Sequence, residues 1–327
     1  MRNHVPLLVL LLAPALAPGQ AQAMDCSKAR TAVEKAICAS SDLRAKDDEM
    51  SALYGEIKAA STEAEQKMLA AAQKKWIAER EDSCGQSEGE DLATCVSDSI
   101  DERITLFKVA PQSGPGSGRK MIPTFLVRDG DSKHYAVNVE LARFAGPKSP
   151  AESIFNDKIA AIAARAPLEP HDSNSDTILE SETSLSLGYA SPRLVSAAVT
   201  WYSDGGAHGN GGVININVDL QKGTEVAITD LLTEEAAANI RKQCRDQIIE
   251  QKKEQSDEPY DPAKDEFLSD KVIADHVADL SRWSISEQDV IITFDAYDIG
   301  PYVDGDYECD FAMADLKKLA KPDAPLP

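Results

Sequence analysis

The sequence predicts two domains of different class: a small disulfide-linked helical bundle, then an α+β domain with a mostly antiparallel sheet. Three observations support this division. Apolar residues recur at three- and four-residue steps before residue 110, and at two-residue steps after residue 120. A segment rich in Pro, Gly and Ser separates the two patterns. The six cysteines divide into four before that segment and two after it.

Residues 1–23 are expected to be an export signal. A short basic start precedes an apolar run at residues 5–17, which is too short to span a bilayer, and the small-x-small motif Ala21-Gln22-Ala23 follows. We therefore predict cleavage after Ala23 and a mature protein that is periplasmic or secreted, with no membrane partner. No later segment is apolar enough to cross a membrane.

Residues 24–110 are predicted to form a helical bundle. A short helix is expected at residues 31–38, and Asp42 is the expected N-cap of the next helix. Three apolar stripes at helical spacing follow. Their members are Leu43, Met50, Leu53, Tyr54 and Ile57; Met68, Leu69, Ala72, Trp76 and Ile77; and Leu92, Val96, Ile100, Ile104 and Phe107. Disulfides would compensate for the thin core of so small a bundle.

The cysteines are expected to form structural disulfides, the default in an oxidising compartment. They are Cys26, Cys38, Cys84, Cys95, Cys244 and Cys309. No C-x-x-C motif is present, so neither a zinc ribbon nor a thioredoxin site is indicated. The first four cysteines allow three connectivities, among which we favour the local closures Cys26–Cys38 and Cys84–Cys95. Cys244–Cys309 is then the pairing left to the second domain.

Residues 111–119 combine Pro, Gly and Ser and are predicted to be a flexible linker. In residues 120–327, runs rich in Val, Ile, Thr and aromatics predict strands at 124–128, 134–144, 183–189, 193–202, 212–220 and 290–294, with a last strand around Cys309. Helices are predicted at 153–166, 234–253 and about 263–280, and a polar loop at 251–265. This order is typical of an α+β domain.

The charge balance limits the class of partner. The chain carries 34 Lys and Arg against 55 Asp and Glu, a net charge of -21. That balance weighs against nucleic acid and against an anionic membrane surface, because both are held by clustered Lys and Arg. Residues 24–110 carry 12 basic and 18 acidic residues, and the second domain 21 and 37. We expect a cationic protein partner, met mainly by residues 120–320.

Two loop segments of the second domain are candidates for recognition. The first is glycine-rich and reads Asp204-Gly205-Gly206-Ala207-His208-Gly209. It either presents His208 and backbone N–H groups to a ligand or forms a wide hairpin turn between two strands. The second segment, residues 297–305, contains Tyr297, Pro301 and Tyr302. Tyrosine offers a large rigid contact area, although a turn packed over its tyrosines has the same composition.

No catalytic residue, cofactor or metal site is predicted. The sequence holds no H-E-x-x-H motif, no nucleophile elbow, no P-loop and no dinucleotide fingerprint. Asp204 and His208 could form a base dyad, but no nucleophile accompanies them. We therefore expect a protein that is not an enzyme.

A set of motifs in the helical domain has a known parallel. The set is Cys26, Val33-Glu34-Lys35-Ala36-Ile37-Cys38, Leu43, Asp47, Leu53-Tyr54, Gln73-Lys74-Lys75-Trp76, Arg80, Cys84, Cys95 and Arg103. Trp76, Arg80 and Cys84 share one helical face because they are four residues apart. From Cys26 to about Lys108, this region resembles the LprI-type family, which is named for a bacterial lysozyme inhibitor.

The second domain has a parallel of its own, over about residues 120–320. The matching residues are Tyr202, Gly205-Gly206-Ala207-His208-Gly209, Asn217, Asp219-Leu220, Gly223, Asp230-Leu231-Leu232, Phe294, Tyr297, Ile299, Pro301-Tyr302 and Gly305. They resemble the extracellular domain of RsiV-type and PdaC-type proteins. That domain recognises lysozyme in the RsiV type and accompanies a separate deacetylase domain in the PdaC type. Thr293-Phe294-Asp295 is followed by Ala296, so deacetylation does not carry over.

Both resemblances point toward lysozyme, whose animal-type members are typically basic, and an acidic binder would be steered to such an enzyme. The expected function is lysozyme inhibition by occlusion of the cleft. Tyr297 and Tyr302 would be anchors, Pro301 would rigidify their loop, and His208 would donate a hydrogen bond or orient the loop. One alternative is a non-catalytic peptidoglycan or muropeptide binder that stacks sugars on Trp201 and Tyr202. The other is a cell-wall hydrolase built on Asp204 and His208.

Overall fold

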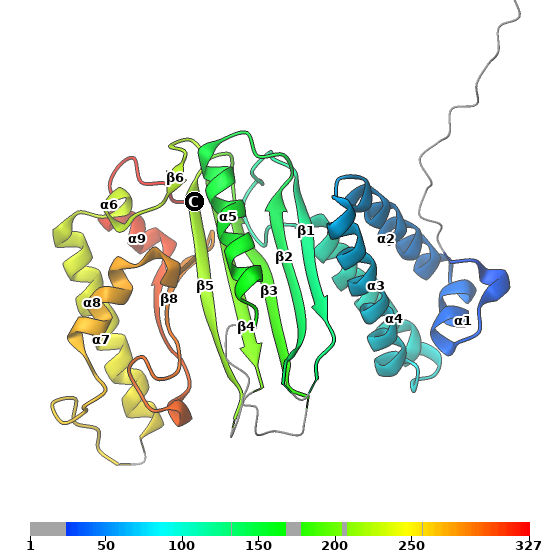
Figure 1. Cartoon of the computed structure of the whole chain (residues 1–327). Coiled ribbons are helices and arrows are strands. Elements are labelled where there is room, and N and C mark those ends of the chain that lie inside the picture. Colours follow the sequence, from blue (N-terminus) through cyan, green and yellow to red (C-terminus); the bar gives the residue numbers. More distant parts are fainter. Residues whose placement is uncertain (1–23, 132, 168–177, 205–207, 257) are drawn as a thin grey trace, which may run out of the picture.

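The structure is a computed structural model, which describes residues 24–131, 133–167, 178–204, 208–256 and 258–327. It confirms the predicted fold class. Figure 1 shows three parts side by side: a helical module, a large sheet with one helix on its face, and a lobe of helices around a small sheet. The predicted signal peptide and the loop residues Gly205, Gly206 and Ala207 lie outside the described residues.

The helical module consists of four helices, α1 (Ala32–Ala39), α2 (Ser41–Ala59), α3 (Glu63–Cys84) and α4 (Gly89–Lys108), after the short 3₁₀ helix η1 (Cys26–Lys28). The prediction of Asp42 as the N-cap of α2 is wrong. The cap is Ser40, whose hydroxyl accepts the backbone N–H of Leu43, while Asp42 lies inside the first turn. Ser40 is preferred because its hydroxyl is three residues from that orphan N–H.

The core of the module follows the predicted stripes, with one departure on α3. The five predicted residues of α4 are all buried. On α3, Ile77 is 42% exposed, and Arg80 takes its place inside. The Arg80 guanidinium lies 4.5 Å from the centre of the Trp76 ring, and Arg103 approaches the same ring at 5.7 Å. Cation–π contact of this kind lets a guanidinium enter an aromatic core. The disulfides Cys26–Cys38 and Cys84–Cys95 are formed as favoured.

The large sheet has six strands in the order of the chain: β1 (Met121–Arg128), β2 (Ala136–Phe144), β3 (Glu180–Ala190), β4 (Leu194–Ser203), β5 (Asn210–Asp219) and β6 (Thr224–Glu225). All neighbours are antiparallel except β2 and β3. The exception arises because α5 (Pro150–Arg165) connects these two strands as a crossover. Five of the six strands were predicted; β6 is only two residues long and carries no alternating pattern.

The two faces of the large sheet are built differently. Val195, Ala197 and Val199 of β4 pack in one apolar core with α5. The alternate residue Ser196 accepts the backbone N–H of Ile285 from the small sheet. On β5, the buried Asn217 donates to the backbone carbonyls of Leu280 and Trp283. The lobe is thus fixed to the sheet by directional polar bonds as well as by apolar contact.

The remaining elements form the lobe. They are α6 (Ile228–Leu231), α7 (Glu234–Gln255), α8 (Asp270–Ala278), the 3₁₀ helix η2 (Leu280–Arg282), β7 (Trp283–Ile285), β8 (Asp289–Phe294), the 3₁₀ helix η3 (Tyr302–Asp304), β9 (Tyr307–Ala312) and α9 (Met313–Leu319). β7, β8 and β9 make an antiparallel sheet. Cys244–Cys309 joins α7 to β9, as predicted.

Two predicted boundaries in the lobe are wrong. The helix expected at about 263–280 starts only at Asp270, because the Asp265 carboxylate accepts the backbone N–H of Phe267 and holds a turn, and Ser269 then caps the helix. The polar loop expected at 251–265 starts later, since α7 continues to Gln255. Within the described ranges, no helix combines the length and the apolar character that a membrane span requires.

The segment 111–119, expected to be flexible, is held against β3. Gln112 N–H donates to the carbonyl of Leu187 at 2.7 Å, and Gly116 N–H donates to that of Ala190 at 2.9 Å. β1 also packs on the helices, so Phe125 belongs to the core of the helical module. The two domains therefore share an apolar contact. The domain boundaries themselves stay a prediction.

Candidate functional site

The two loops singled out in the sequence meet in the structure. The first connects β4 to β5, with Ser203 paired to Asn210 at its base. The second connects β8 to β9, with Phe294 paired to Tyr307. Both are hairpin connections, yet they come from different sheets whose loop ends lie on the same side of the molecule (Figure 1). Residues about ninety positions apart are thereby brought into contact.

His208 is the centre of this contact. Its ring stacks on that of Tyr302, with centroids 3.8 Å apart and planes 22° apart. Its Nδ1 lies 2.9 Å from the carbonyl oxygen of Gly209, and its Nε2 lies 3.3 Å from the hydroxyl of Tyr297. A carbonyl only accepts, so Nδ1 is the donor to Gly209, while the Tyr297 hydroxyl can donate to or accept from Nε2. Tyr302 donates to the same Gly209 oxygen at 2.6 Å. His208 of the first loop therefore contacts both tyrosines of the second.

The surface above this network exposes aromatic and aliphatic groups. Tyr202 is 49% exposed, Tyr297 56% and Val303 86%. Together with His208 and Tyr302 they form what we call the loop patch. Large apolar groups gathered in this way on a protein surface are typical of contact with another macromolecule. Val303 was not among the predicted site residues, because a lone valine in a polar stretch carries no signal.

Glycine is required next to the patch. A Cβ at Gly209 would lie 1.9 Å from the hydroxyl oxygen of Tyr202, so the tyrosine can occupy its position only beside a glycine. The same hydroxyl donates to the Asp204 carboxylate at 3.1 Å. This hydrogen bond to a negative group raises the pKa of Tyr202. The predicted residues Asp204 and Gly209 thus both position Tyr202.

The Tyr297 loop is constrained along its backbone. Tyr297 has a φ of 76°, in the left-handed region that costs free energy for a residue other than glycine. Ile299 is fully buried in the core of the lobe and fixes the loop below its tip. Pro301 is the N-cap of η3, and its carbonyl accepts the N–H of Asp304.

A cluster of four ionisable side chains supports the base of the same loop. Asp298 accepts from Nε2 of His276 at 2.9 Å and lies 3.4 Å from Arg282, which also bonds to Asp295. The second ring nitrogen of His276 faces the carbonyl of Val272. Both ring nitrogens of His276 therefore lie beside oxygen atoms that can accept a hydrogen bond. We call Arg282, His276, Asp295 and Asp298 the brace.

The two brace aspartates differ in acidity. Burial raises the pKa of Asp295, and the charge of Arg282 only partly offsets this. Burial also acts on Asp298, but hydrogen bonding to His276 and the charge of Arg282 outweigh it and lower the pKa of that carboxyl. Sequence reasoning missed the brace. The one residue in the sequence that reflects the brace is Gly212, because a Cβ at that position would lie 3.0 Å from the Asp295 carboxylate.

The structure bears on the two alternative sites. Asp204 bonds to Tyr202, and each ring nitrogen of His208 has a different partner, so the described contacts do not pair these two residues as a base dyad. Trp201 and Tyr202 are consecutive on β4 and point to opposite faces of the sheet. The expectation that both rings line one groove is therefore wrong.

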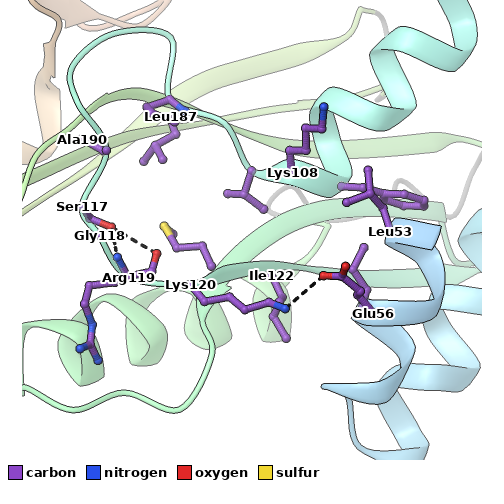
Figure 2. A pocket seen from close by; sticks show the side chains of 16 residues that line it. Leu53, Glu56, Lys108, Ser117, Gly118, Arg119, Lys120, Ile122, Leu187 and Ala190 are labelled. Carbon is purple, nitrogen blue, oxygen red and sulfur yellow. Dashed lines mark hydrogen bonds and ion pairs between the residues drawn. The ribbon is translucent and has the colours of Figure 1, made fainter. Parts of the chain in front are cut away.

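A cavity of about 450 Å³ lies between the helical module and the large sheet. Its walls are mostly apolar, and Lys108, Arg119 and Lys120 lie on its lining. Figure 2 shows the Lys120 amine directed at Glu56 of α2. Lys108 pairs with Glu49, and Arg119 with Glu152. Because all three cations are paired with carboxylates of the chain, the cavity is a joint between the domains rather than a free anion site.

Comparison with known families divides the chain in the same way. Residues 24–106 match the family model "Lysozyme inhibitor LprI". Residues 229–312 match "Protein of unknown function (DUF3298)". The chain carries an LprI module followed by a DUF3298 domain. The first match spans the helical module, and the second spans α6 to β9, including the brace, the Tyr297 loop and the Cys244–Cys309 disulfide.

Two solved structures of the DUF3298 family are similar to this chain. One, from Bacteroides fragilis NCTC 9343, is 13% identical, covers 63% of this chain and 93% of its own, and has a TM-score of 0.36. The other, from Pseudomonas aeruginosa PAO1, is 16% identical, covers 65% and 99%, and has a TM-score of 0.41. Among curated proteins, none matches the chain.

Proposed function

We propose that this protein is exported, binds lysozyme and inhibits it by covering the substrate cleft. The LprI family, to which the helical module is matched, is described as a family of lysozyme inhibitors. Three disulfides and no free cysteine among the described residues suit an oxidising compartment outside the cytoplasm. Cleavage after Ala23 is part of this proposal.

The observation that supports a protein partner best is the exposure of the loop patch. Tyr297 is more than half exposed although its backbone is held in a costly conformation, and Ile299 and the brace hold it there. A rigid aromatic that is already ordered loses little entropy on binding, and such residues dominate interface energies. Of the large hydrophobic residues that the structure describes in the helical module, Ile77 alone is exposed. The loop patch is thus the stronger contact surface.

The charge of the second domain adds a rate advantage. The patch is flanked by Asp204, Asp304 and Asp306, in a domain whose basic residues are far outnumbered by acidic ones. Complementary charge at the edge of an interface raises the association rate more than the final affinity. Capture of a basic lysozyme should therefore slow down as salt screens these charges.

The test is lysis of a cell-wall suspension by egg-white lysozyme, followed by turbidity, together with direct binding to the purified chain. We expect inhibition by the wild type. Tyr297→Ala should weaken binding by about thirtyfold, which corresponds to about 2 kcal/mol for an interface anchor. The matched control is Ile77→Ala, an exposed residue of the helical module, which should bind as the wild type.

Each contrary outcome has a definite meaning. If the wild type neither binds lysozyme nor slows lysis at micromolar concentration, the proposed function is wrong. If Ile77→Ala loses affinity and Tyr297→Ala does not, lysozyme binds the LprI module, and the loop patch is not the contact surface.

A further inference from the structure

The buried carboxylate of Asp47 contacts the first residue that follows the predicted cleavage point. The backbone nitrogen of Met24 donates to Oδ2 of Asp47, on α2, at 3.0 Å. Asp47 is only 6% exposed. Among the described residues, this N–H is its one hydrogen-bond donor, and no Lys, Arg or His side chain forms an ion pair with it. Because a buried carboxylate is costly without a cationic partner, the Met24 nitrogen occupies the place where a positive charge would be most stabilising.

The charges around this contact also favour a further cation. Met24 and Asp47 lie on the wall of a cavity of about 290 Å³ among α1, α2 and α3, whose wall also includes Glu34, Glu81 and Arg80. Burial lowers the pKa of Arg80, and the charges of the three carboxylates offset part of this effect. One guanidinium thus faces three carboxylates, and a second positive group would bring the wall closer to neutrality.

The chain is anchored from Met24 onward, so the position of its nitrogen does not depend on Asp47 alone. The Met24 side chain packs against the core of the helical module. Asp25 caps η1 by accepting the backbone N–H of Ser27 at 3.1 Å. Cys26 is joined to α1 by the Cys26–Cys38 disulfide. Three successive residues therefore hold the start of the predicted mature chain in place.

We propose that removal of the signal peptide after Ala23 turns the Met24 nitrogen into an ammonium group that forms an ion pair with the buried Asp47 carboxylate. The inference rests on that cleavage, which is part of the proposed function. A signal peptidase adds one water across the Ala23–Met24 peptide bond. The oxygen of the water joins the Ala23 carbonyl carbon to give a carboxylate, and both hydrogens pass to the Met24 nitrogen. At neutral pH an α-amino group stays protonated in most molecules.

Processing changes what Asp47 meets. Before cleavage, the Met24 nitrogen is a neutral amide with one N–H. After cleavage it carries three N–H donors and a positive charge, and a charge-assisted hydrogen bond to a carboxylate is stronger than a neutral one. The LprI module therefore reaches its full stability only once the signal peptide has been removed. A neighbouring anion also favours the charged form of an amine, so the pKa of the Met24 amine should lie above that of a free N-terminus.

The test uses the full chain, exported with its own signal peptide and purified with its disulfides formed. Mass spectrometry should show a chain that begins at Met24. Its α-amino group is then labelled at pH 7 with acetic anhydride, which reacts with unprotonated amines. Asp47→Asn keeps an acceptor but removes the charge, so its α-amino group should be labelled about tenfold faster than that of the wild type, which corresponds to one unit of pKa. Asp48→Asn, an exposed change on the same helix, is the matched control and should be labelled at the wild-type rate.

A second comparison leaves Asp47 unchanged and moves the ammonium group. A chain that begins at Ala23, released from a tag by a protease, carries its positive charge one residue earlier, about 3.8 Å away along the backbone. In urea unfolding, the equilibrium constant for unfolding of this chain should be about tenfold larger than that of the chain that begins at Met24.

Three results would overturn the proposal. The first is an exported chain that begins at a residue other than Met24. The second is an equal labelling rate in Asp47→Asn and Asp48→Asn, and the third is equal stability of the chains that begin at Ala23 and at Met24. Wall lysis by lysozyme is measured on the same preparations. A chain that begins at Met24 and shows the labelling contrast but does not slow lysis would contradict lysozyme inhibition and support the ion pair.

Discussion

The LprI module and the loop patch present their chemistry in opposite ways. In the module, Arg80 and Arg103 are 6% and 3% exposed, and both guanidinium groups lie near the Trp76 ring. In the loop patch, Tyr297 and Val303 are 56% and 86% exposed and face solvent. Cation–π contact of buried guanidinium groups contributes to the packing of the module, whereas rigid exposed aromatics favour a macromolecule that covers them. The two regions thus direct their aromatic groups oppositely, the module toward its interior and the loop patch toward solvent.

The disulfides of the two regions also differ in how far apart along the chain their cysteines lie. The disulfides of the helical module close loops of 12 and 11 residues, which bridge neighbouring elements. Cys244–Cys309 closes 65 residues and joins α7 to β9, next to the strand that ends in the Tyr297 loop. The loop patch therefore depends on a long-range link, and the module on local ones.

The largest expected effect is on stability and tests this difference. Removing Cys244–Cys309 with the double substitution Cys244→Ala and Cys309→Ala should lower the free energy of unfolding by about 4 kcal/mol, because a longer loop restricts the unfolded chain more. The matched removal of Cys26–Cys38 should cost about 3 kcal/mol. Urea unfolding, followed by circular dichroism, measures both. A larger loss for the Cys26–Cys38 variant would contradict the order given by loop length.

The second prediction concerns the contact between the two domains. Arg103 of α4 has a side chain only 2% exposed and pairs with Glu140 of β2 at 2.7 Å. Glu140→Ala leaves this buried cation without its partner and should cost about 2 kcal/mol, less than a fully buried pair because Glu140 is 26% exposed.

The control is the exposed ion pair between Glu56 and Lys120, which joins the same two domains. Glu56 and Lys120 are both more than half exposed, so Glu56→Ala should change stability by less than about 0.5 kcal/mol. Urea unfolding of the two variants should separate them clearly. Equal losses would mean that the buried position of Arg103 does not determine the cost.

Local patterns in the sequence predicted most of the fold, and the misses have local causes. Period-two runs located five strands of the large sheet, and the α4 stripe from Leu92 to Phe107 was entirely correct. Asp42 was misplaced as a cap because Ser40 and Asp42 both carry cap-forming side chains and only the backbone decides between them. The 111–119 segment was expected to be flexible because its bonds to β3 join residues more than seventy positions apart.

The candidate site was predictable only in part. Both loops were visible as Gly-rich or Tyr-Pro-Tyr segments, but neither segment indicates the other. Their contact depends on the docking of the small sheet, which Ser196 and Asn217 fix through bonds to its backbone. The brace could not be found, since Arg282, His276 and the two aspartates are ordinary surface-type residues in sequence. Arg80 was recognised as part of a motif, but its burial beside Trp76 is a property of packing alone.

The smallest expected effect is a pH dependence of the loop patch that the brace imposes. The pKa of Asp298 is lowered in the folded protein, so its stabilising contribution is complete above the unfolded pKa and is lost as pH falls below about 4. The pKa of Asp295 is raised, so its contribution has the opposite sign and is lost as pH rises above about 4. The two aspartates thus act in adjacent pH windows.

Asp298→Asn should therefore reduce the loss of loop stability as pH falls below about 4. Asp295→Asn should reduce the change in loop stability as pH rises above about 4. Hydrogen exchange of the loop amides in residues 296–305, measured across pH and corrected for intrinsic rates, isolates this effect from global unfolding. The amides of α4 serve as an internal reference, because they lie in the helical module. If Asp298→Asn shifted protection equally in α4 and in the loop, the brace would act on the whole molecule, and the separation between the two regions would not hold at this level.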